Sequence, residues 1–168
     1  MTKWAFSNPF WTPTAVADTA TMTANGACFL QGGSATQKLL VSEIKVDGLA
    51  AATAINNLVF ARSSTIAVTA ITLGTNGKNA PLDVFAANLA AVQVPGFSAT
   101  TMPQRAATLH LIPISINTFG GIERWVAYPG EEITIYGTAT SIGEASLSNT
   151  NLTGTPGAMT SLIVYEPS

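Results

Sequence analysis

The chain has 168 residues and a net charge of −2, and charged residues make up 10% of it, against about a quarter in an average soluble domain. The seven Lys and Arg residues are scattered. The sequence therefore predicts no nucleic-acid partner and no membrane partner, because both surfaces are bound through clustered basic side chains. No run approaches the roughly 18 apolar residues of a membrane span, and no signal peptide is expected.

Residues 1–36 are predicted to form an extended N-terminal arm and lead-in to a folded domain. Four aromatic residues fall in the first eleven positions, and Pro9 and Pro13 oppose a helix there. Aromatic side chains bury a large area, so two interpretations stay open. The arm either folds back over its own core or docks on a neighbouring subunit. The candidate interface residues of the arm are Trp4, Phe6, Phe10 and Trp11.

Residues 37–168 have the sequence pattern of a β-sandwich domain. In the stretch 65–73, for example, successive side chains alternate between two faces, which is typical of a half-buried strand. One short helix is predicted near 81–91, since Pro81 suits a first helical position and apolar residues follow at helical spacing. The predicted strands are 38–46, 54–61, 65–73, 108–117, 122–128, 132–137, 143–148 and 159–166.

About eight strands with turns at these spacings predict an all-β fold. We expect a two-sheet antiparallel sandwich, and the jelly roll is the commonest arrangement of this kind. Pro113 lies inside a predicted strand, where it cannot donate a hydrogen bond to a neighbour. It should therefore mark a sheet edge or a bulge.

The stretch 119–137 is predicted to be a hairpin. Pro129 and Gly130 suit the two central positions of a type II turn between its strands. Alternation then places Trp125 and Tyr136 on one outer face, with Arg124 nearby. This face is either a ligand platform or a subunit contact, and the low charge of the chain favours the contact. These three residues complete the set of candidate interface residues.

The titratable residues do not form a recognisable catalytic or metal-binding pattern. No Asp, Glu or Ser near His110 repeats the order of a catalytic triad, and one His cannot build a zinc site alone. Cys28 is expected to be a buried small residue. Glu131 and Glu132 are adjacent, so their side chains point to opposite faces, and Glu144 is distant from them. The sequence thus predicts no enzyme, no catalytic residue, no cofactor and no metal.

The sparse charge predicts self-association. A monomer of 17.3 kDa exposes roughly 7,800 Å² by the usual surface scaling. Charges as sparse as these leave neutral gaps that approach the largest apolar patches monomers tolerate. We expect other subunits to cover much of this surface, in a homotrimer or a larger assembly.

The chain resembles a group of small virion proteins of tailed bacteriophages. The motifs that carry the resemblance are VSEIKVDGL at 41–49, LVFARSST at 58–65, FGGIERWVAYPGEE at 119–132 and IVYEP at 163–167. The resemblance implies a jelly-roll protein that decorates and cements the capsid, with the major capsid protein or another virion protein as partner. It also implies localisation in the virion after synthesis in the host cytoplasm.

Two alternative functions remain compatible with the sequence. A phage tail or baseplate component would have the same sequence features as a capsid cement protein. A carbohydrate-binding or receptor-binding sandwich would use Trp125 or Tyr136 as a stacking platform. Copy number in a purified particle separates a head protein from a tail protein, and glycan binding identifies the last class.

Overall fold

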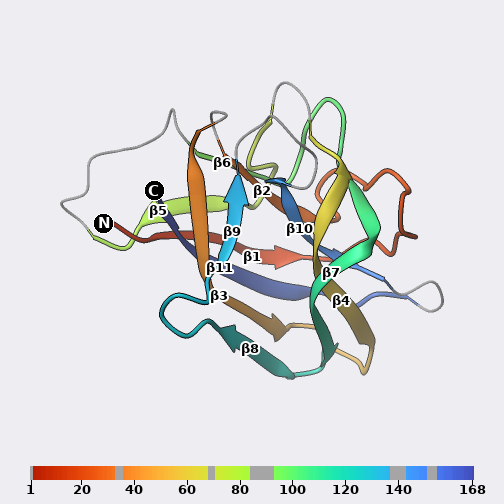
Figure 1. The fold of residues 1–168 in the computed structure, drawn as a ribbon. Helices are drawn as coiled ribbons and strands as arrows, with labels where there is room; N and C mark the ends of the chain where they lie inside the picture. Colours follow the sequence, from red (N-terminus) through yellow and green to blue (C-terminus); the bar gives the residue numbers. More distant parts are fainter. Residues whose placement is uncertain (1, 33–35, 68–70, 84–92, 137–142, 151–154) are drawn as a thin grey trace.

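The computed structural model describes residues 2–32, 36–67, 71–83, 93–136, 143–150 and 155–168. They form two antiparallel sheets that pack face to face and do not close into a barrel (Figure 1). The predicted all-β sandwich is confirmed, with eleven strands in the described part where about eight were expected. The strands are β1 (Trp4–Trp11), β2 (Cys28–Gly32), β3 (Lys38–Gly48), β4 (Ile55–Thr65), β5 (Lys78–Pro81), β6 (Gln93–Gly96), β7 (Gln104–Asn117), β8 (Ile122–Val126), β9 (Ile133–Tyr136), β10 (Ala145–Asn149) and β11 (Met159–Pro167).

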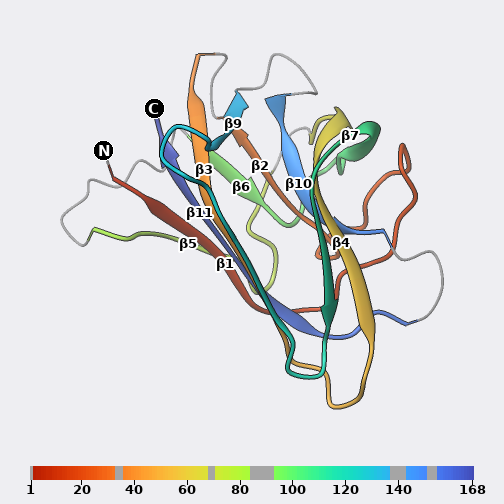
Figure 2. The ribbon, with the colours of Figure 1, turned by 60° about the horizontal axis from the view of Figure 1, so that its bottom comes forward.

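The strands pair in a nested order. Sheet A has the order β5-β1-β11-β3, and both β8 and β9 pair with β3 at its far edge; sheet B has the order β6-β2-β10-β4-β7. The early strands β1, β2 and β3 thus pair with the late strands β11, β10 and β8/β9, and β4 pairs with β7. This connectivity is jelly-roll-like. Figure 2 shows the two sheets leaning together, with the β3–β4 and β7–β8 connections at one end of the sandwich.

The N-terminal aromatic segment is a strand inside sheet A. β1 lies between β5 and β11, and the side chains of Trp4, Phe6 and Trp11 are buried in the core. The register with β11 shifts between Asn8 and Trp11, so Pro9 falls where it need not donate to the ladder. For these three side chains, the interpretation that the arm packs on its own core is therefore the correct one.

The core lies between the two sheets and draws side chains from almost every strand of both. Phe97, which follows β6, joins the sheets by ring contacts. Its centroid lies 4.9 Å from that of Phe6 and 5.7 Å from that of Trp11. Tilted and edge-on rings at these separations add to the stabilisation from buried area. The aromatic residues of β1 therefore fill the centre of the sandwich.

The predicted hairpin at 119–137 is wrong, although its turn is confirmed. The backbone N–H of Glu131 donates to the carbonyl of Tyr128 at 2.9 Å, and Gly130 has a φ of 88°, as a type II turn requires. However, β8 pairs with the second half of β3 and β9 with its first half. The two strands follow one another along the same edge, and the turn is an excursion between them.

The new pairing separates two residues that were predicted to share a face. Trp125 lies opposite the buried Ile44 and is itself half-buried against the core. Tyr136 lies opposite Lys38, is 46% exposed and has the Lys38 Nζ atom 5.7 Å from its ring centroid. The intervening excursion breaks the simple alternation, which is why counting along the chain failed.

The predicted strand at 65–73 and the predicted helix near 81–91 are not found as predicted, and part of each lies outside the described residues. β4 continues to Thr65 in place of turning at 62–64, so no separate strand covers 65–73; residues 68–70 lie outside the described part. Pro81 ends β5 and does not begin a helix, and the rest of the predicted helix falls mainly in 84–92, also outside the described residues.

Pro113 does lie in an edge strand, β7. Within the described ranges, none of the structure is a helix with the length and apolar character needed to cross a membrane.

Candidate functional site

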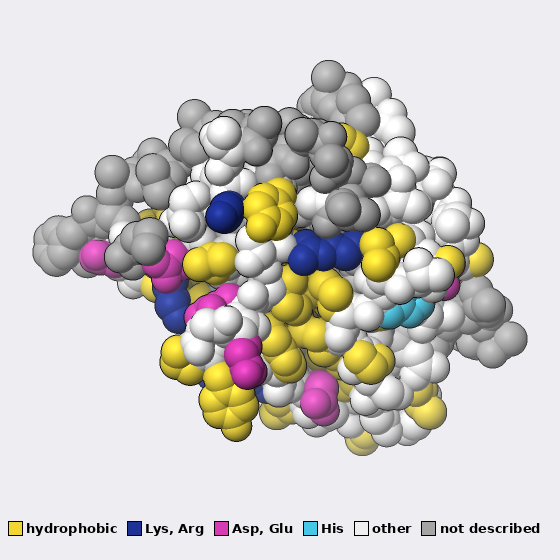
Figure 3. Space-filling model, viewed as in Figure 1, with side chains coloured by type: hydrophobic (Ala, Val, Ile, Leu, Met, Phe, Trp, Pro, Cys, Tyr) yellow, Lys and Arg dark blue, Asp and Glu magenta, His cyan; other side chains and the backbone are white. Residues whose placement is uncertain are grey.

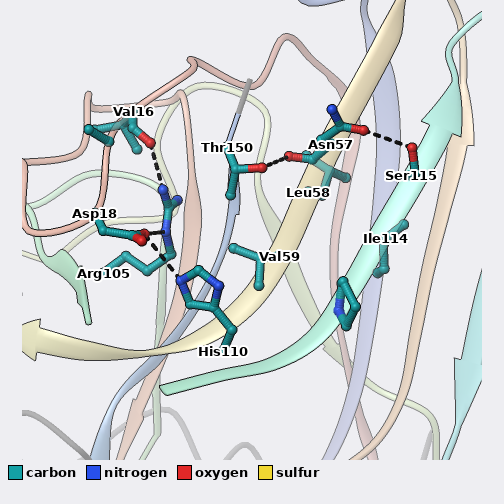
Figure 4. Close-up of a pocket in the computed structure, with 12 residues that line it drawn as sticks. Val16, Asp18, Asn57, Leu58, Val59, Arg105, His110, Ile114, Ser115 and Thr150 are labelled. Carbon is teal, nitrogen blue, oxygen red and sulfur yellow. Dashed lines mark hydrogen bonds and ion pairs between the residues drawn. The ribbon is translucent and has the colours of Figure 1, made fainter. Parts of the chain in front are cut away.

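A cavity of about 690 Å³ lies beside β4 and β7 of sheet B (Figure 4). Its floor comes from these two strands, and one wall comes from the loop that follows β1. The strand side chains that alternate with those of the core contribute polar atoms, so the cavity has mixed character. Its lining residues are Val16, Ala17, Asp18, Asn57, Leu58, Val59, Arg105, His110, Pro113, Ile114, Ser115 and Thr150.

Arg105 is the central side chain of this site, and it is only 1% exposed. Its Nε donates to Asp18 Oδ1 at 2.5 Å, and its two Nη atoms donate to the carbonyl of Val16 at 2.6 Å and to Ser148 Oγ at 2.7 Å. A guanidinium holds several acceptors at fixed angles. Arg105 therefore fastens the loop after β1 to strands β7 and β10.

Asp18 stands between two basic side chains. Its Oδ1 lies 3.1 Å from His110 Nε2, in addition to the Arg105 contact. Burial alone raises the pKa of Asp18, but the hydrogen bond and charge of Arg105, with smaller contributions from His110, outweigh burial and hold the pKa below its usual range. The carboxylate is thus ionised at neutral pH and engaged by both neighbours.

Neither Asp18 nor Arg105 was predicted from the sequence. The carboxylate partner of His110 lies 92 residues away along the chain, so no local pattern indicates it. The available signal was that Asp18 is the only charged residue between Lys3 and Lys38. A lone charge in such a segment indicates a specific partner, but not which one.

The described contacts of the cavity do not activate a nucleophile. Ser115 Oγ donates to Asn57 Oδ1 at 2.7 Å, and Ser148 Oγ accepts from Arg105. In the described ranges, neither hydroxyl is bonded to His110, as a catalytic triad would require. These contacts fasten the loop after β1 to the strands of sheet B. The exposed His110 ring and the apolar wall of the cavity remain available to a ligand.

Two other titratable side chains lie deep in the sandwich. Burial raises the pKa of the Cys28 thiol to about 12, so Cys28 is a poor nucleophile. Glu144 accepts from Ser63 Oγ at 2.6 Å and from the backbone N–H of Ala67 at 2.9 Å. Burial nevertheless raises its pKa to about 7, because these two hydrogen bonds only partly offset the loss of water.

Among the described residues, no three His, Cys, Asp or Glu side chains converge to hold a metal ion.

Glu144 should make stability depend on pH. Its pKa rises from 4.5 in the unfolded chain to about 7 in the folded one, so its contribution is complete below pH 4.5 and is lost as pH rises through 7. The loss amounts to about 3 kcal/mol by linkage. Glu144→Gln should remove it, and the variant should gain stability over the wild type between pH 4.5 and 8. Urea unfolding at several pH values measures this difference, with the exposed Glu123→Gln as control. A difference that does not change with pH would contradict the assignment.

The structure distributes the predicted interface residues over different environments. Trp4, Phe6 and Trp11 are in the core, whereas Phe10 is 56% exposed. On β8, Arg124 Nε donates to Glu43 Oε1 at 2.7 Å on an exposed surface. These seven residues do not form one surface.

The candidate site is thus a loop clamp beside an open cavity, with the residues proposed for subunit contact lying elsewhere on β1, β8 and β9. Arg105 and Asp18 define the geometry of the site. These two side chains do not belong to a recognisable catalytic arrangement. Comparison of the chain with models of protein families, with curated proteins and with solved structures found no match.

Proposed function

We propose that the protein is a structural virion component that decorates and stabilises a bacteriophage capsid through contacts between subunits. The observation that carries this proposal is the nature of the surface. The chain exposes 7770 Å², close to the area expected for its mass, and large hydrophobic side chains interrupt this sparsely charged surface. The large hydrophobic residues that are exposed are Phe10, Leu49, Ile55, Leu82, Leu109, Leu111, Phe119, Ile122, Val126, Tyr128 and Tyr136.

The exposed hydrophobic side chains are concentrated in one part of the chain. Seven of the eleven fall between Leu109 and Tyr136, on β7, β8, β9 and the connections between them. Figure 3 shows hydrophobic side chains gathered in the middle of the face that these strands border. Hydrophobic side chains gathered on one exposed face are typical of protein contact sites. This arrangement therefore supports a function in assembly.

The fold is compatible with this function. The resemblance to tailed-phage virion proteins implies a jelly roll, and the nested pairing of the two sheets is jelly-roll-like. Sandwiches of this type also serve other functions, so the surface and not the fold is the main support.

The location of the protein in purified virus particles tests the proposal. We expect cryo-electron microscopy to place it on the outside of the capsid, and quantitative mass spectrometry to count hundreds of copies. A handful of copies would indicate a tail or baseplate component. Absence from the particles would contradict both functions.

Self-association is expected in solution as well. Native mass spectrometry and light scattering at micromolar concentration should show a trimer or a larger closed assembly, because the exposed apolar side chains gain from burial. A monomer that stays dispersed at these concentrations would contradict this prediction.

A further inference from the structure

Arg62 is a partly buried cation without a carboxylate partner. On β4 it continues the inward alternation of Leu58 and Phe60 and lies opposite Ala145, all three in the core cluster. Its Nη1 atom is buried and has no hydrogen-bond partner among the described residues. Burial lowers the pKa of its guanidinium, with a smaller opposing effect from Tyr136 on β9. A charge in this position is costly unless it is paired.

No carboxylate of the chain fills this role. All nine Asp and Glu side chains lie within the described ranges. The ion pairs of those ranges use Asp18, Glu43 and Asp47, and none includes Arg62. A carboxylate for Arg62 must therefore come from another molecule.

Arg62 lies on β4, next to the edge strand β7, and interacts electrostatically with Tyr136 of β9. We call this side of the sandwich the open edge. There β7 ends sheet B, and β8 and β9 end sheet A. Half-buried hydrophobic side chains of these strands, Ile112, Trp125 and Ile133, pack against the core from this side. In contrast, β5 and β6 extend the opposite edges of the two sheets. Among the described residues, the open edge thus combines apolar side chains, unpaired strand backbone and one unpaired cation.

The turn between β8 and β9 has the complementary composition. Tyr128, its first residue, is 76% exposed. The carboxylate of Glu132 already accepts from the backbone N–H of Gly130 at 3.0 Å. Glu131 is exposed and has no side-chain partner among the described residues. An exposed aromatic ring and an unpaired carboxylate therefore lie at the first and fourth positions of the turn.

We propose that the Tyr128–Glu131 turn of one copy docks on the open edge of a second copy. The Tyr128 ring contacts the apolar side chains of the edge, and the Glu131 carboxylate pairs with Arg62. The occupant is a second copy because one chain carries both halves of the contact. The unpaired Glu131 carboxylate has the exposed Tyr128 ring near it, and the unpaired Arg62 guanidinium has apolar side chains around it. The contact joins two different surfaces, the turn of one copy and the open edge of the next, so it is heterologous. It gives a closed ring where the rotation between copies closes and a filament where it does not. This inference rests on the self-association part of the proposed function.

Charge reversal tests the contact. Glu131→Arg and Arg62→Glu should each raise the dissociation constant of the assembly by about tenfold or more, because each places like charges together in a desolvated contact. The double variant carries both reversals in every copy and should regain much of the lost affinity. Tyr128→Ser should weaken the assembly without a change in charge. Sedimentation velocity and native mass spectrometry of the purified full chain measure these effects.

Controls separate loss of contact from loss of fold. Glu166→Arg makes the same charge change on β11, in the interior of sheet A, and should leave the assembly intact. Circular dichroism checks each variant, and if Arg62→Glu does not fold, Arg62→Met tests the same pair and should also weaken the assembly. An assembly that is insensitive to both Glu131→Arg and Tyr128→Ser, or a monomeric wild type, would overturn the proposal. The copy number in virus particles decides the proposed function independently of this result.

Discussion

Deletion of residues 1–13 is expected to leave a chain that does not fold. The deletion removes β1 from between β5 and β11 and takes three buried aromatic side chains out of the core. Replacing one such side chain by Ala costs about 3–5 kcal/mol, and a domain of this size has only about 5–15 kcal/mol in total. The loss therefore exceeds the available stability. Circular dichroism and thermal melting of the truncated protein should show no cooperative transition.

Point substitutions on β1 provide a matched comparison. Phe6 is buried and contacts Phe97, whereas Phe10 on the same strand is 56% exposed. Phe6→Ala should reduce the free energy of unfolding by about 3–5 kcal/mol, and Phe10→Ala should change it by less than about 1 kcal/mol. A truncated protein that melts cooperatively near the wild-type temperature, or equal effects of the two substitutions, would show that β1 does not hold the core.

Arg105→Ala is expected to be the most damaging substitution of a charged residue. It removes four hydrogen bonds from a buried guanidinium and leaves the Val16 carbonyl and Ser148 Oγ without their donor. Each buried acceptor left without its donor costs about 1–3 kcal/mol, so the two together account for several kcal/mol of the free energy of unfolding. Urea unfolding measures this loss. Hydrogen exchange should also accelerate at the amide of Val16, which donates to the Asn149 carbonyl across the same junction.

Arg124→Ala is the matched control for Arg105. Both arginines donate through Nε to a carboxylate, at 2.5 Å for Arg105 and 2.7 Å for Arg124. They differ in burial, since the Arg105 side chain is 1% exposed and the Arg124 side chain 57%. Water solvates and screens an exposed pair, so the Arg124 substitution should leave the unfolding midpoint almost unchanged. Similar effects of the two substitutions would contradict the function of Arg105 as a loop clamp.

The fold class and several local features were readable from the sequence. Alternating side chains predicted the strands at 38–46 and 159–166, which the structure contains as β3 and β11. The residues Pro129 and Gly130 predicted the type II turn, because only certain residues adopt its backbone angles without strain. Pro113 indicated an edge position, because a central strand needs an N–H that proline lacks. Each of these inferences depends on chemistry within a few neighbouring residues.

Strand pairing and the loop clamp were decided by the tertiary structure. Backbone N–H and carbonyl groups are the same in every strand, so the sequence did not show that β8 and β9 follow one another along β3. The four aromatic residues near the N-terminus required a surface, but the gain from burial is the same on their own core as on a neighbour. Likewise, Asp18 and Arg105 meet across 87 positions. Local pattern determined which residues become strands and which faces are apolar, whereas the choice of partner required the packing of the whole chain.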